Sequence, residues 1–345
     1  MAYSRLFQTG FEFNDVDELE SIAGFGSGSS TINSSNQKTG DRCLQLNTSC
    51  PPRGKAIAGT STLTTQCGLY LRHNSTGTSD EAIIFLIRGS VDISVTYDNS
   101  ENKVRIRVDG VEEDSESPAT LGVSTSNEYH HYGLYVYRDS SSGRVALYID
   151  GSLALEFDGD TGTYTNGVYA GGELTVTAWS ASAYIDDFWC RYSTTLETEV
   201  PPASYTYEMI RPSADGSTNN WSVSGAANNY EAVDDSSPDD DSTYVYSTSA
   251  SVVDEYALDD FSVPSGFSIN AVIPTVLARK TSSGSSPTLE IGLNEDSTDE
   301  YATAHDLTTT FEYYFSVFDD TPDSSSWDDT NIDATTLKIR SAGTF

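Results

Sequence analysis

The sequence predicts an all-β protein built of two tandem β-sandwich domains. Apolar and aromatic residues occur in short runs separated by Gly, Ser, Thr, Asn and Asp, as in strands joined by turns. No helical spacing of apolar residues persists beyond about two turns. A chain of 345 residues is also long enough for two domains.

The clearest strands form a meander in the middle of the chain. Residues 133–137 and 145–149 are rich in aromatic and aliphatic side chains that suit a half-buried sheet, and residues 153–157 continue the pattern. Between the second and third runs, Asp150 and Gly151 supply the positive φ angles that a two-residue hairpin requires. The spacing therefore predicts three consecutive antiparallel strands.

Further strands are expected on both sides of this meander. Val104, Ile106 and Val108 alternate with basic residues, and this period of two places the three apolar side chains on one face. The acidic stretch 112–126 is expected to be a polar connection. The strands expected outside the meander comprise residues 6–13, 41–47, 65–72, 81–88, 91–97, 103–108, 172–179 and 183–192.

Two segments, residues 128–151 and 183–192, resemble the closing half of a laminin-G-like or concanavalin-like jelly roll. In that family a strand opening on Trp-His-His leads into a hairpin ending Tyr-Val-Asp-Gly, and a late Ile-Asp-Asp strand closes the sandwich. Tyr129 stands where the family usually has Trp. The residues that match in kind and order are His130, His131, Tyr148, Ile149, Asp150, Gly151, Ile185, Asp186 and Asp187. The resemblance implies a jelly-roll domain over residues 1–192 that is more often a binding or structural module than a catalyst.

A linker is expected at residues 193–204, where Thr, Glu and the pair Pro201-Pro202 predict a semi-rigid connection open to proteases. A second β-sandwich follows at residues 205–345. The aromatic run 311–318 reads as its strongest core strand, and Pro274 interrupts the run 268–279 in the manner of an edge or bulge. The other expected strands are residues 243–247, 254–258, 288–293 and 335–340.

This second half resembles the terminal β-domains of tailed-virus structural proteins. The residues that carry the resemblance are Arg211-Pro212, Asp215, Trp221, Tyr230, the acidic run 234–241, Tyr244 and the segment 327–332. The resemblance implies a module used in virion assembly.

The charge of the chain excludes two classes of partner. There are 18 Lys and Arg residues against 52 Asp and Glu residues, a net charge of −34. Such a surface repels nucleic acid and anionic membranes. Two interpretations stay open, an acidic secreted or virion protein and a protein from a halophile, where salt screens the self-repulsion. No apolar stretch reads as a signal peptide or a membrane span, which favours a virion component made in the cytoplasm.

Calcium is the ion that the sequence favours, because it prefers several carboxylate and carbonyl oxygens. Laminin-G-like modules often hold calcium near loop carboxylates, so the resemblance implies Asp186 and Asp187 as ligands. Asp158 and Asp160 form a second candidate loop, and the acidic run 234–241 forms a third. The alternative for each is a solvated acidic turn.

No catalytic residue is predicted. A glycosidase needs two carboxyl groups about 5 Å apart on one face, and the nearest candidate, residues 15–20, does not place enough carboxylates on one side of a strand. His130 and His131 are expected at the start of a strand, one inward and one outward. Two interpretations of the cysteines stay open, because spacing does not fix connectivity. Either Cys43 pairs with Cys50 across a short loop and Cys67 with Cys190 across the sandwich, or all four are buried thiols.

The function predicted is that of a non-enzymatic virion protein of a tailed virus. It would decorate the capsid, form a turret or spike, or attach to the tail. Other virion proteins, further copies of the same chain and host-surface glycans are its expected partners. A glycan-binding adhesion lectin is the first alternative, and a glycoside hydrolase is the second.

Overall fold

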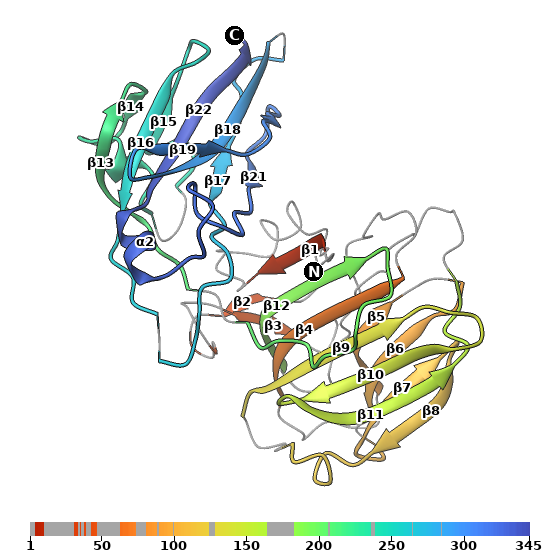
Figure 1. Cartoon of the computed structure of the whole chain (residues 1–345). Coiled ribbons are helices and arrows are strands. Elements are labelled where there is room, and N and C mark those ends of the chain that lie inside the picture. Colours follow the sequence, from red (N-terminus) through yellow and green to blue (C-terminus); the bar gives the residue numbers. More distant parts are fainter. Residues whose placement is uncertain are drawn as a thin grey trace. The chain divides into compact units, whose positions relative to one another are not determined.

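The protein is described here from a computed structural model. The structure describes residues 4–9, 31–33, 35, 38, 43–46, 63–73, 81–87, 90–98, 100–123, 128–163, 183–205, 208–235, 239–263, 265–283 and 285–345. The chain divides into two compact units, Met1–Glu208 and Met209–Phe345, each of which is almost entirely β (Figure 1). The all-β prediction is confirmed.

The first unit is built on an eight-stranded antiparallel sheet, here called the large sheet. Its strands run in the order β11-β10-β9-β4-β12-β3-β2, and β1 pairs with β12. The bounds are β1 Ser4–Thr9, β2 Thr31–Asn33, β3 Cys43–Leu46, β4 Thr64–His73, β9 His130–Tyr137, β10 Gly143–Ile149, β11 Ser152–Gly159 and β12 Ala183–Ser193.

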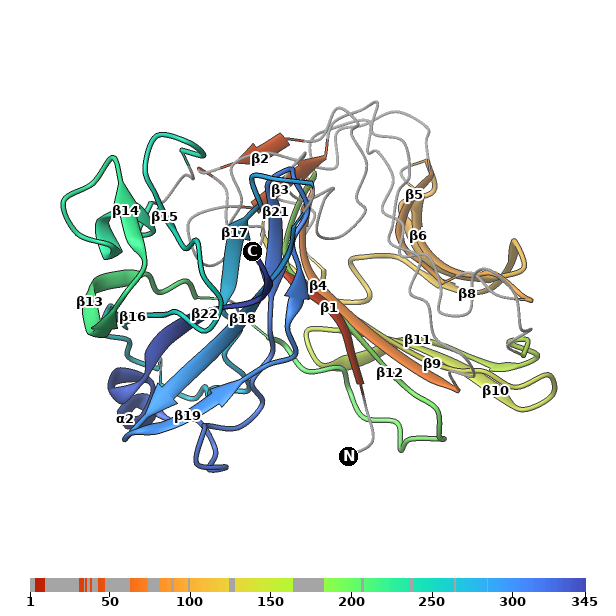
Figure 2. The same ribbon diagram turned by 90° about the horizontal axis from the view of Figure 1, so that it is seen from above.

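A four-stranded sheet forms a second layer over the meander side of the large sheet (Figure 2). It comprises β5 Glu81–Ile87, β6 Ile93–Asp98, β7 Lys103–Val108 and β8 Val111–Glu116 in sequence order. Val104, Ile106 and Val108 are buried, which confirms the predicted apolar face of β7. The strand β8 lies in the stretch expected to be a polar connection. That expectation was wrong because β8 is an exposed edge strand with few apolar side chains.

Turn chemistry sets the register of the meander. Asp150 and Gly151 have φ angles of 49° and 79°, as the hairpin prediction required. At the preceding turn, the Asp139 carboxylate accepts hydrogen bonds from the backbone N–H groups of Ser141 and Ser142. These bonds to the ionised form lower the pKa of Asp139 to about 2.

Arg138 joins the two layers of the first unit. Its guanidinium is buried and donates to the backbone carbonyls of Ile87, Val91 and Thr161 at 3.0, 2.5 and 2.6 Å. These carbonyls lie at the end of β5, just before β6 and just after β11. A single buried cation therefore satisfies three backbone acceptors that belong to different strands.

The second unit has a six-stranded sheet in the order β13-β16-β22-β18-β19, with β20 also paired to β18. Two small ribbons, β14–β15 and β17–β21, accompany it. The bounds are β13 Pro212–Asn219, β14 Ser222–Ser224, β15 Tyr244–Tyr246, β16 Val253–Leu258, β17 Thr275–Ala278, β18 Ser286–Glu295, β19 Thr298–Tyr301, β20 His305–Asp306, β21 Glu312–Phe315 and β22 Thr336–Thr344.

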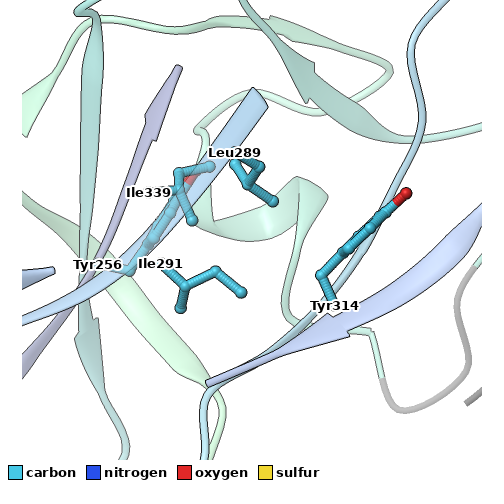
Figure 3. Close-up of a cluster of buried hydrophobic side chains, with 5 residues drawn as sticks. All are labelled: Tyr256, Leu289, Ile291, Tyr314 and Ile339. Atoms are coloured by element: carbon cyan, nitrogen blue, oxygen red, sulfur yellow. The ribbon is translucent and has the colours of Figure 1, made fainter. Parts of the chain in front are cut away.

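The main core of this unit lies on one face of the six-stranded sheet. Figure 3 shows its buried side chains, which are Tyr256, Leu289, Ile291, Tyr314 and Ile339. The ten-residue strand β18 supplies two of them and pairs with β22, β19 and β20. The run 311–318, predicted as the strongest core strand, supplies the buried residues Tyr314 and Phe318. Its strand β21 is four residues long and pairs with β17, outside the six-stranded sheet.

A second cluster surrounds the short helix α2, Asp329–Ala334, which the sequence analysis did not predict. Trp327 and Ile332 pack there with Leu293 and Phe318, and the indole of Trp327 donates to the Phe318 carbonyl at 3.0 Å. Asp328 and Asn331 form a capping box at its start. In the part of the chain that the structure describes, no helix has the length and apolar character needed to cross a membrane.

Candidate functional site

The outer face of the large sheet, turned away from the four-stranded sheet, carries a band of aromatic and basic side chains. Strand alternation places every second residue of β4, β9, β10 and β12 on this face. The cross-strand register aligns these positions. The residues are Gln66, Gly68, Tyr70, His131, Gly133, Tyr135, Arg144, Ala146, Tyr148, Trp189 and Arg191.

Residues 194–205, here called the strap, lie across this face. Four strap carbonyls accept hydrogen bonds from sheet side chains, and none of these bonds uses strand pairing. The donors and acceptors are Thr64 to Thr195 at 3.0 Å, Tyr135 to Glu197 at 3.0 Å, Gln66 to Val200 at 3.4 Å and Trp189 to Ala203 at 3.1 Å. The segment expected to be a semi-rigid linker therefore lies against the first unit.

Two glycines make room for the strap. Gly68 and Gly133 are register partners on β4 and β9. A Cβ on Gly133 would lie 2.8 Å from Pro202, and one on Gly68 would lie 2.5 Å from the indole nitrogen of Trp189. Both positions therefore need glycine for a close approach. Pro202 is buried over the first, and the Trp189 ring covers the second with only 2% of its surface exposed.

Arg144 holds the middle of the strap through a charge cluster. Its guanidinium contacts the carboxylate of Glu199, and that carboxylate also accepts from the Tyr148 hydroxyl. The same guanidinium bonds Glu156 at 2.8 Å and Asp158 at 3.0 Å. Hydrogen bonding to Glu199 is the main reason that the pKa of Arg144 is raised. Three carboxylates thus converge on one arginine, and one of them belongs to the strap.

His131 lies under the strap without a partner for its Nε2 atom. It is 3% exposed, and its ring packs edge-on against Tyr70 with centroids 5.3 Å apart. The hydroxyl of Tyr70 in turn contacts Ser204 of the strap. Burial lowers the pKa of His131 to about 4, although the Asp150 carboxylate opposes the shift. The imidazole is therefore neutral at physiological pH.

The predicted calcium ligands are held apart. Asp158 lies on β11 and Asp186 with Asp187 on β12, and β10, β9 and β4 lie between. Four strand spacings amount to about 19 Å. Asp158 binds Arg144, and Asp160 accepts from the backbone N–H of Gly162 at 2.8 Å.

Asp186 and Asp187 are fully buried and lie within β12, as the predicted strand 183–192 places them. Asp186 accepts from the backbone N–H groups of Lys38 at 2.7 Å and of Asp187 at 2.9 Å. Asp187 has a φ of 49° at a bulge of β12. The carboxylate of Asp186 therefore holds two backbone donors.

The third acidic loop lies in the second unit. Asp235 and Asp239 both accept from Thr243, and Asp241 pairs with Arg279 at 2.5 Å. Burial and the nearby Asp239 charge raise the pKa of Asp235. No group of three or more His, Cys, Asp or Glu side chains within metal-binding reach occurs among the residues that the structure describes. Calcium at any of these loops stays a prediction.

The carboxylate pair that most deserves comparison with a glycosidase site is one the sequence analysis missed. Glu156 and Asp158 alternate on β11 and share a face, because β11 extends beyond the predicted strand 153–157 to Gly159. Both are bound to Arg144, so neither has the apolar setting of a general acid. The candidate segment at residues 15–20 lies outside the described residues. His130 and His131 open β9 as predicted, and His130 Nδ1 bonds Asp150 at 2.6 Å.

The residues behind the second resemblance have structural roles. Asp254 is fully buried and accepts four hydrogen bonds, from Asn220 N–H, Trp221 N–H, the Asn229 amide and the Tyr256 hydroxyl, at 2.6–2.8 Å. Asp215 accepts from the backbone N–H of Tyr230 at 2.7 Å. Trp221 and Tyr230 pack against the core of Figure 3. This part of the motif therefore builds the scaffold.

The sequence matches no protein-family model and no curated protein. Among solved structures, the chain is similar to the Caenorhabditis elegans galectin LEC-6 at 12% identity, covering 42% of this chain and 94% of the galectin with a TM-score of 0.28. It is similar to an endo-1,3-β-glucanase from Streptomyces sioyaensis at 11% identity, covering 56% and 98% of the two chains with a TM-score of 0.35. It is also similar to the carbohydrate-binding module CBM66 from Bacillus subtilis at 12% identity, covering 55% and 95% with a TM-score of 0.27. Likeness at this level carries no activity or ligand over to this chain.

Proposed function

We propose that this chain is a non-enzymatic structural protein of a tailed-virus particle. The observation that carries the proposal is the strap. The face of the first unit best equipped with aromatic and charged groups is filled by the chain's own residues, from Thr195 to Tyr205. Its polar atoms serve to hold that segment in place, which suits a scaffold better than a catalytic cleft.

The second unit supports the same proposal. Its resemblance to the terminal domains of tailed-virus proteins rests on Asp215, Trp221, Tyr230 and Trp327, and all four help to build the described core or its hydrogen-bond network. These four residues therefore contribute to the folded structure of the second unit. A net charge of −34 would keep such a protein soluble at the surface of a particle.

The proposal includes self-association. A chain of this charge cannot attract its own copies by charge at low salt, so contacts between copies must use apolar faces, strand edges, bound cations or screening salt. Sedimentation in low and in molar salt measures this. A monomer under both conditions would contradict the homo-oligomer.

The test of the main proposal is localisation. Antibodies raised against the recombinant chain should label purified particles from the source, and mass spectrometry of those particles should find its peptides in many copies. A chain found only outside particles would contradict the virion assignment. Release of reducing ends from a polysaccharide panel would contradict the non-enzymatic assignment.

A glycan-binding adhesion protein is the second candidate, favoured by one surface feature. Tyr244 and Tyr246 lie side by side on β15 with ring centroids 5.9 Å apart, and they are 36% and 43% exposed. Ser222 and Ser224 are their cross-strand partners on β14. A glycan array with the wild type and a Tyr244→Ala/Tyr246→Ala variant tests this site. Equal signals from both proteins would rule it out.

A further inference from the structure

We propose that Cys67 and Cys190 form a disulfide that links β4 to β12 at the centre of the large sheet. The two residues are direct register partners on adjacent antiparallel strands. Such partners have Cα atoms about 4.5 or 5.5 Å apart. Both values fall inside the range of about 4.4–6.8 Å that a disulfide spans. The prediction of a pair across the sandwich thus becomes a pair within one sheet.

The two thiols face each other in the interior of the first unit. Cys67 and Cys190 are 1% and 3% exposed, whereas their neighbours Gln66 and Arg191 point to the outer face and bond each other. Both cysteines are free in the structure, and burial and a hydrogen bond with Cys190 raise the pKa of the Cys67 thiol. Little thiolate is present in the folded protein, so exchange with an external disulfide is slow until the strands open.

The reaction needs an external disulfide, which we take to be oxidised glutathione. One cysteine thiolate attacks it to give a mixed disulfide and releases one glutathione. The second cysteine then displaces the other glutathione as the Cys67–Cys190 bond forms. Two electrons pass from the cysteines to one oxidised glutathione, and the two protons end on two reduced glutathione molecules.

The bond would stabilise the strands that carry the strap. Gln66 and Tyr70 on β4, and Trp189 on β12, all contact strap residues. A link between residues 67 and 190 closes a long loop, and long loops gain most from a disulfide in the chain-entropy account. The inference does not depend on the proposed function, because the disulfide would form in the first unit whatever the function of the protein is.

Cys43 is a poor competitor on the strand register. β3 pairs with β12 through residues 183–185, so Cys43 lies near position 186 of β12. Four residues of strand separate that position from Cys190, a distance of roughly 13 Å. The register therefore favours Cys67 as the partner of Cys190.

The test uses the full chain. The reduced, unfolded protein is refolded over a series of reduced to oxidised glutathione ratios, free thiols are alkylated, and unreduced digests are examined by mass spectrometry. A peptide pair joining Cys67 to Cys190 is expected. Once formed, the bond should resist dithiothreitol in buffer and yield to it in denaturant.

Variants provide the control. Cys43→Ala and Cys50→Ala should keep the linked peptide and the higher Tm of the oxidised form, whereas Cys67→Ala and Cys190→Ala should lose both. If refolding fails, the natively purified protein is incubated with oxidised glutathione at sub-denaturing urea and mapped in the same way. Free thiols at both positions under every ratio, or links to Cys43 or Cys50, would overturn the proposal.

Discussion

Acidification should destabilise the first unit through His131. This side chain is 3% exposed, has no acceptor for a proton on Nε2, and has a pKa of about 4 in place of 6.5. Because the folded-state pKa is the lower one, the unfolded chain binds more protons between pH 6.5 and 4. Stability is therefore lost as the pH falls through that window, and this group contributes nothing above it.

The magnitude follows from the two pKa values. Linkage gives a loss of about 2 kcal/mol at pH 5 relative to pH 8, and about 3 kcal/mol once the pH is well below 4. The groups around the ring are Tyr70, Trp189 and Asp150, whose carboxylate accepts from the His131 backbone N–H at 2.9 Å. Among the residues that the structure describes, Asp150 carries the charge that opposes the effect of burial on the imidazolium.

The assay is urea unfolding of the full chain at pH 8 and pH 5, followed by tryptophan fluorescence. His131→Phe and His131→Gln remove the titrating group, and the use of two variants guards against strain from either one. The carboxylates titrate equally in all three proteins, so the difference between wild type and variant isolates His131. Parallel losses of stability in the three proteins would refute the reasoning.

Three further predictions test the strap and the second unit. Gly133→Ala places a Cβ 2.8 Å from Pro202 and should lower the unfolding free energy of the first unit by about 1–3 kcal/mol. It should also speed cleavage at Glu197 and Glu199 by a glutamate-specific protease. An unchanged cleavage rate would contradict the packing of the strap against the sheet. Asp254→Ala removes the acceptor of four donors, two of them in buried hydrogen bonds. It should cost about 3–5 kcal/mol of the second unit's unfolding free energy, more than Asp254→Asn does. The second unit, residues 209–345, holds 5 basic and 24 acidic residues, so its Tm should rise more than that of the first unit from 0.01 M to 1 M salt. Calcium but not magnesium should replace much of that salt. A Tm unchanged by salt, calcium and magnesium would mean that the acidic turns are merely solvated.

Sequence patterns predicted correctly those features that depend on neighbouring residues, such as tight turns. The hairpin at Asp150 and Gly151 was found because few other residues accept positive φ. The strand β18 was underestimated because its importance comes from pairing with β19, β20 and β22, which lie on both sides of it. The run 311–318 was ranked above β18 because the sequence shows which residues are hydrophobic but does not show where a strand lies in its sheet. Edge strands such as β8 carry too few apolar residues to be predicted from the hydrophobic pattern of the sequence.

The strap shows why the candidate site could not be predicted from spacing. Several of its polar contacts join residues more than fifty positions apart, as in Arg144 with Glu199 and Gln66 with Val200. Nothing in the composition of residues 193–204 separates a free linker from one held by a sheet, because Thr, Glu and Pro suit both. The distinguishing signal lay in the sheet itself. Gly68 and Gly133, two strand glycines that become register partners, mark the place where another part of the chain must approach the backbone closely. A glycine inside a predicted strand is therefore the feature that should prompt a search for a covering segment.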